Sequence, residues 1–176
     1  MSELLLHFAV PFAVFSYFRR PKEAFLLSLV ALLPDLDVLI GIHRSWTHSV
    51  IVVLAFCGVA LLLVRVLRPK LLGLGFLAVL ALISHLLLDL FTTYTPLLWP
   101  LISQSFFVSF NLGVRMGESM RVYVLPKVLV MPTSFAHFQY LDAPVFTSEG
   151  FVVAVILISS ALLSRCLKPS KRLFKT

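Results

Sequence analysis

One stretch of the chain decides its fold class: residues 71–91 read LLGLGFLAVLALISHLLLDLF. A helix needs about 20 mainly apolar residues to cross the hydrocarbon core of a bilayer, and this stretch supplies them. Its ionisable side chains are His85 and Asp89, which lie one helical turn apart near its end. The stretch therefore predicts a membrane-spanning helix that carries two potential ligands on one face.

The composition extends this prediction to the whole chain. Hydrophobic residues make up 60% of the sequence, charged residues 13%, and the mean hydropathy is +1.01, outside the range of soluble domains. A net charge of +7 would suit nucleic acid, but the basic residues stand in short groups at the ends of apolar runs. We therefore expect an integral membrane protein that has lipid around it and no nucleic-acid partner.

Five apolar runs are the expected spans, at residues 4–18, 23–42, 48–67, 71–91 and 151–167. They predict an all-α membrane protein, with residues 1–176 forming one domain built on a bundle of about five transmembrane helices. Prolines break residues 92–150, which we expect to form an irregular outer cap between the fourth and fifth helices. Runs at 122–125 and 128–131 in that cap look like short strands or surface-lying pieces.

Basic residues predict the orientation of the chain in the membrane. They follow the first run, separate the third from the fourth, and fill the C-terminal tail: Arg19, Arg20 and Lys22; Arg65, Arg68 and Lys70; Arg165, Lys168, Lys171, Arg172 and Lys175. Loops rich in Lys and Arg stay in the cytoplasm. We therefore expect a multi-pass protein of the cell (plasma or inner) membrane, with its N-terminus outside and its C-terminus cytoplasmic.

The ionisable residues within the apolar runs indicate a metal site. Each Asp near the centre of a membrane helix opposes insertion by about 2.5–3.5 kcal/mol unless something compensates its charge. In the expected orientation these residues all lie in the outer half of the membrane, and carboxylates with imidazoles are ligands for zinc or another transition metal. The expected metal ligands are His7, Asp35, Asp37, His48, His85 and Asp89.

Two local patterns leave the roles within this site open. Asp35 and Asp37 are two residues apart, so they do not point the same way on a regular helix, although Pro34 can loosen the local geometry. We expect both at the site: one can bind metal while the other orients a ligand or faces the turn, and either of them can be the catalytic general base.

The polar turn HRSWTHS at 43–49 offers further candidates. Arg44 is a candidate catalytic residue that clamps a phosphate or carboxylate, or it contacts lipid headgroups. Thr47 or Ser49 caps the following helix, or reaches the site. The possible additional site residues are His43, Thr47, Ser49 and, from the cap, Glu118. His137, also in the cap, is expected to be structural.

These motifs resemble a known family. The sequences LPDLD at 33–37, HRSWTHS at 43–49 and SHLLLD at 84–89, with PLLWP at 96–100, resemble the YdjM-like family of membrane-bound metal-dependent hydrolases over about residues 1–101. The order of the motifs is also similar to that of zinc-dependent phospholipase C. That similarity implies a zinc ion held by Asp35 or Asp37 with His48, His85 and Asp89, and a second held by His7 with Asp89 as the bridge. Ligands for a third ion have no match, so the resemblance implies one or two.

The expected function is therefore that of a membrane-embedded hydrolase, phosphodiesterase-like or phospholipase-like. A bound divalent metal ion, most simply zinc, activates water, and Arg44 steadies the developing negative charge. The depth of the site suits a phosphoester or lipid-linked substrate in the outer leaflet. Two alternatives stand beside this hypothesis: a metal or proton transporter, because intramembrane Asp and His residues also mark ion pathways, and a metal-stabilised membrane protein without turnover.

Overall fold

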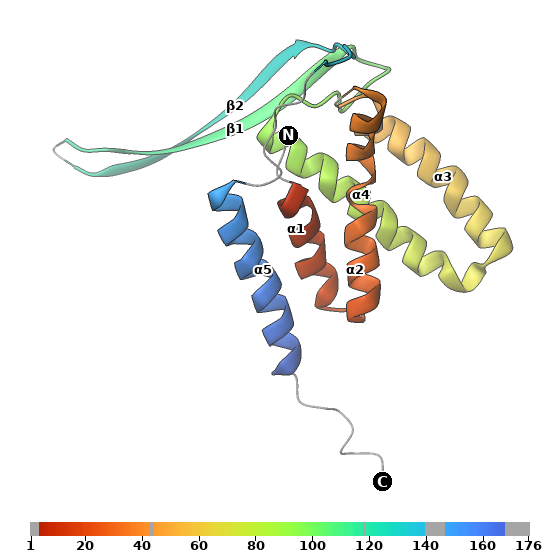
Figure 1. Ribbon diagram of the computed structural model, residues 1–176. Helices are drawn as coiled ribbons and strands as arrows, with labels where there is room; N and C mark the ends of the chain where they lie inside the picture. Colours follow the sequence, from red (N-terminus) through yellow and green to blue (C-terminus); the bar gives the residue numbers. More distant parts are fainter. Residues whose placement is uncertain (1–3, 43, 118, 140–146, 168–176) are drawn as a thin grey trace.

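The computed structural model describes residues 4–42, 44–117, 119–139 and 147–167. Over these residues the chain forms five α-helices, three short 3₁₀ helices and one two-stranded antiparallel sheet (Figure 1). The α-helices are α1 (Leu4–Ser16), α2 (Pro21–Val30), α3 (Val50–Leu67), α4 (Leu72–Thr92) and α5 (Ser148–Cys166). The strands are β1 (Gln104–Arg115) and β2 (Arg121–Pro132), and the 3₁₀ helices are η1 (Leu33–Ile40), η2 (Trp46–His48) and η3 (Pro69–Leu71).

Three of the described helical segments are long and apolar enough to cross a membrane. They are α3, α4 together with η3, and α5. Helix α1 is apolar but has 13 residues, and α2 has 10 before the chain winds more tightly into η1. The five helical segments overlap the five expected runs, although α2, α4 and α5 extend one to three residues beyond them, and crossing by all five stays a prediction.

The helices pack around α1, which lies between α2 and α5, while α3 and α4 form a neighbouring hairpin (Figure 1). Phe12 and Phe15 of α1 form the core with Leu27 of α2 and with alanines of α4 and α5. Small residues at these contacts let the helix backbones approach one another closely. Large apolar side chains elsewhere face outward, for example Phe56 and Val66 of α3, as expected for a surface that lipid covers.

The two ends of this bundle differ in charge. The α1–α2 turn, the α3–α4 turn and the C-terminal end of α5 lie at the lower end in Figure 1. Arg165 of α5 reaches across this end, where its Nε donates to the carbonyl oxygen of Ser16 at 2.8 Å and its Nη2 donates to that of Arg19. The opposite end holds η1, η2 and the C-terminal end of α4. The basic groups are thus separated from the buried Asp and His residues by the length of the helices.

The prediction of an all-α protein with an irregular cap is wrong. Strands β1 and β2 pair residue for residue from Gln104 opposite Pro132 to Arg115 opposite Arg121. The prolines that favoured an irregular cap are compatible with this sheet, because each strand of a two-stranded sheet has one unpaired edge, where a residue without an N–H group is tolerated. The cap is therefore a long β-hairpin, which projects sideways beyond the helices (Figure 1).

Candidate metal centre

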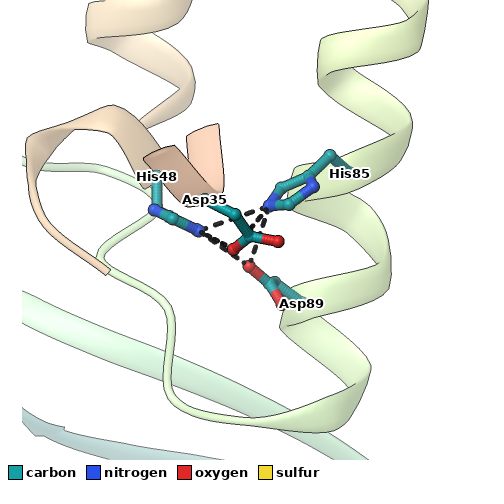
Figure 2. A group of neighbouring side chains, drawn as sticks. All are labelled: Asp35, His48, His85 and Asp89. Carbon is teal, nitrogen blue, oxygen red and sulfur yellow. Dashed lines mark hydrogen bonds and ion pairs between the residues drawn. The ribbon is translucent and has the colours of Figure 1, made fainter. Parts of the chain in front are cut away.

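Four buried side chains meet near the upper end of the bundle: Asp35, His48, His85 and Asp89 (Figure 2). The two histidines and Asp89 have no exposed surface, and Asp35 is 7% exposed. Each offers one nitrogen or oxygen atom, and these atoms all lie within 4.8 Å of one another. This is a group of side chains that can hold a metal ion.

Separate elements bring these side chains together. His85 and Asp89 lie one turn apart on α4, so both point to the same side of the helix. Asp35 lies in the first turn of η1, directly after Pro34. His48 ends η2, just before Ser49 caps α3 by accepting a hydrogen bond from the backbone N–H of Val52 at 3.4 Å.

Five of the six distances among the four donor atoms are close to those of tetrahedral coordination. His48 Nε2 lies 3.1 Å from Asp89 Oδ2 and 3.3 Å from His85 Nε2, and His85 Nε2 lies 3.3 Å from Asp89 Oδ2. Asp35 Oδ1 lies 3.5 Å from His48 Nε2 and 3.6 Å from His85 Nε2. Zinc bonds of about 2.0–2.1 Å place tetrahedral ligand atoms about 3.3–3.4 Å apart. The donor atoms therefore have the right chemistry and nearly the right spacing for a zinc-sized ion.

The electrostatics of the group also favour a cation. Burial opposes a positive charge on His48, but three neighbouring carboxylates, first that of Asp35, raise the pKa of its imidazole to about 10. Asp89 Oδ2, buried between two imidazoles, accepts no hydrogen bond within the described part of the chain. A buried carboxylate is costly unless a positive charge compensates it. The negative charges that favour a proton on His48 would therefore also favour a divalent cation at this position.

Asp37 lies behind His48 and not among the four. Its Oδ2 is 3.3 Å from His48 Nδ1, and it accepts hydrogen bonds from the backbone N–H of Ser45 at 2.7 Å and the hydroxyl of Thr47 at 3.0 Å. A carboxylate on the far nitrogen of a ligating histidine fixes the ring and its tautomer. The structure thus gives different positions to the two aspartates that the sequence could not distinguish.

His7 and Arg44 approach the other oxygen of Asp89. His7 Nε2 lies 3.4 Å from Asp89 Oδ1, and the His7 ring stacks on that of His85 with centroids 4.0 Å apart. Arg44 Nη2 lies 3.7 Å from the same oxygen, and Arg44 Nη1 donates to Thr93 Oγ1 at 3.2 Å. Asp89 therefore connects the four-residue group to a second polar position, as the expected bridge would.

The remaining candidates have lesser or undetermined roles. Thr47 supports Asp37, and Ser49 caps α3, while His43 and Glu118 lie outside the described residues. His137 pairs through its backbone with Ile42 and is not one of the four. Sequence reasoning missed Ser45 and Thr93, although the density of hydroxyl groups in 43–49 is a signal for the first.

The fold and this group of ligands define a helical membrane protein with a buried site that can hold a metal ion. The chain belongs to the YdjM inner membrane protein family, whose family model matches residues 3–168. This confirms the expected family and extends the match beyond the first 101 residues, through the hairpin and α5. No curated protein and no solved structure matches the chain.

Proposed function

We propose that this protein is a metal-dependent hydrolase that cleaves a phosphoester in a lipid or lipid-linked substrate. The observation that carries the proposal is a buried group of four side chains that can hold a metal ion, Asp35, His48, His85 and Asp89, with the guanidinium of Arg44 beside it. Two nitrogen and two oxygen ligands suit zinc among the common divalent metals. When bound, such an ion supplies a Lewis acid that polarises a phosphoryl oxygen and activates water.

The neighbouring residues have distinct tasks in this proposal. Arg44 is held by Thr93, and its side chain is 14% exposed, so its guanidinium is placed to bind a phosphoryl oxygen of the substrate. Asp35 Oδ2 is buried and accepts no hydrogen bond within the described residues, which makes it the candidate proton acceptor. Asp37 is a positioning residue, because its contacts run to His48 and the 45–47 turn.

An apolar cavity next to the site supports a lipid substrate. The cavity has a volume of about 160 Å³ and lies between η1, η2, α3 and α4. Its walls include Leu33, Pro34, Trp46, Thr47, Val53 and Phe56. Pro34 precedes Asp35 and Thr47 contacts Asp37, so a chain of methylene groups in this cavity would bring its polar end close to the metal ligands.

The test is hydrolysis by purified protein in detergent and in liposomes, after removal of metal and after return of zinc, manganese or magnesium. Phospholipids and a soluble phosphodiester are the substrates. We expect metal-dependent turnover, lost in Asp35→Asn and retained in His137→Ala, which changes a histidine outside the group. Turnover that survives chelation, or that Asp35→Asn leaves unchanged, would contradict the proposal.

A second candidate function has its own observation. Catalytic zinc sites usually keep one position for water, whereas four protein ligands close a tetrahedron, as in structural sites. The alternative is therefore a membrane protein that the metal stabilises without turnover. It predicts that metal removal lowers the unfolding temperature, and that no substrate in the panel is hydrolysed at any metal concentration.

A further inference from the structure

The two faces of the β1–β2 hairpin differ in polarity. Residues with even numbers share one face in both strands, because Val108 pairs with Val128 and Leu112 with Val124. Every even position from 106 to 114 and from 122 to 130 is Phe, Val, Leu or Pro. The odd positions are mixed: they hold the polar residues Ser109, Asn111 and Lys127, and also apolar residues such as Leu125 and Leu129. One face of the hairpin is therefore apolar over residues 106–114 and 122–130, and the polar side chains of these stretches all lie on the other.

The apolar face of the hairpin is directed toward the same side as the helices. Phe110 on this face contacts Phe91, near the C-terminal end of α4, with ring centroids 5.7 Å apart. Phe107 on the opposite face contacts Tyr94, which follows α4 in the chain. Toward the tip the apolar side chains lose this cover: Leu112 is 73% exposed and Val122 60%. Figure 1 shows this part of the hairpin projecting sideways past the helices.

An isolated hairpin of two strands is only marginally stable in water, and a contiguous exposed apolar face indicates a partner or a membrane. The hairpin crosses the end of the spanning helices and extends past them in Figure 1, so a membrane around those helices would lie beneath its projecting part. The outer edges of both strands carry unpaired backbone groups, which hydrocarbon cannot satisfy. The interfacial layer supplies hydrogen-bonding partners for the backbone and apolar surroundings for the side chains.

We propose that the hairpin is an interfacial anchor, whose partner is the lipid surface at the end of the molecule that holds the metal centre. Its even-numbered side chains enter the upper acyl region, and its backbone lies at the depth of the headgroups. Arg115 and Arg121, paired at the tip, and Lys127 on the polar face then lie where lipid phosphates attract them. The inference is independent of the proposed hydrolysis.

Depth measurements on single cysteines test this anchor. In a Cys57→Ala/Cys166→Ser background, an environment-sensitive fluorophore is attached at Leu112→Cys or Val124→Cys on the apolar face. The matched controls are Asn111→Cys and Tyr123→Cys, one residue along each strand on the other face. The protein is placed in vesicles of phosphatidylethanolamine and phosphatidylglycerol, some of which carry spin-labelled acyl chains.

We expect the labels at 112 and 124 to shift to the blue and to be quenched by the spin-labelled chains, and the labels at 111 and 123 to be quenched by aqueous iodide. Equal lipid quenching on both faces, or none at 112 and 124, would overturn the anchor. Cross-linking between copies through Leu112→Cys would also overturn it, by showing that a second chain covers the face. Leu112→Glu/Val124→Glu should abolish lipid quenching of a Val114→Cys label, whereas Asn111→Glu/Tyr123→Glu should preserve it.

Discussion

At the scale of single residues, Asp35 and Asp37 have different positions in the candidate metal centre. Asp35 Oδ1 faces the Nε2 atoms of His48 and His85, whereas Asp37 Oδ2 faces His48 Nδ1. Asp35 is therefore placed to bind an ion, and Asp37 is placed to orient His48. Two similar residues so close in sequence should respond differently to the same substitution.

Asp37→Asn should weaken metal binding by about 10–100-fold without changing the number of ions bound, because outer carboxylates tune a ligating histidine. Asp35→Asn removes a ligand and should have the larger effect. Titration with zinc in competition with a chelator measures both affinities. If Asp37→Asn lost the ion outright while Asp35→Asn kept it, the two roles would be reversed.

Arg44 gives a second test at this scale, one that rests on the proposed hydrolysis. Arg44→Gln should lower kcat/KM for a phosphodiester by about tenfold to a hundredfold, because a hydrogen bond between charged groups is lost. Arg44→Lys should recover part of this loss, since it restores the charge without the planar fork. Lys127→Gln on the hairpin is the control, and an equal loss there would remove the argument for Arg44.

The candidate ligands could be found from sequence because Asp and His are conspicuous in apolar runs. His7, Asp35, His48, His85 and Asp89 all lie at or beside the group. The separate roles of Asp35 and Asp37 could not be found, because they depend on the winding of η1. Each residue of a 3₁₀ helix turns by about 120°, so the side chains of Asp35 and Asp37 point about 120° apart, compared with about 160° on an α-helix. Both side chains can therefore lie beside His48.

At the scale of elements, the turn from η2 into α3 holds His48 in place. Ser49 has no exposed surface; it caps α3 and donates to the carbonyl oxygens of Leu97 and Trp99 beyond α4. One side chain therefore ties the start of α3 to the segment that follows α4.

Ser49→Ala should lower the free energy of unfolding by about 0.5–2 kcal/mol, the range for loss of a helix cap, with further loss because the carbonyl oxygen of Trp99 loses the Ser49 hydroxyl as a donor. Denaturation in mixed detergent micelles measures the change. Ser160→Ala, at an exposed position of α5 whose hydroxyl bonds only within its helix, should have little effect. Similar losses in both variants would contradict the role given to Ser49.

The β1–β2 hairpin is the element that the sequence predicts least well. Its even-numbered apolar positions alternate as a strand requires, but Pro126 and Pro132 interrupt the second strand. Proline is unfavourable in a central strand but is tolerated in an edge strand. The sequence alone does not show that this sheet has only two strands, both of which are edge strands. The sequence therefore indicates short strands within an irregular cap, and not the long pairing from Gln104 to Pro132.

At the scale of the whole molecule, the separation of charge along the helices predicts the orientation. Lys22 is the second residue of α2 at the basic end, whereas Leu101 is 80% exposed near the start of the hairpin at the other end. The basic end should be cytoplasmic. In a cysteine-free background, an impermeant thiol reagent should label Leu101→Cys in intact cells, and Lys22→Cys only after lysis. The reverse pattern would overturn the orientation.

The central claim is that four buried side chains bind a divalent metal ion, and metal content tests it most directly. Elemental analysis of protein purified in detergent should find one or two divalent ions per chain in the unmodified protein and in His137→Ala. The ion held by the four residues should be missing from His85→Ala/Asp89→Ala. Unmodified protein that contains no divalent metal and takes up none from added zinc would contradict the account.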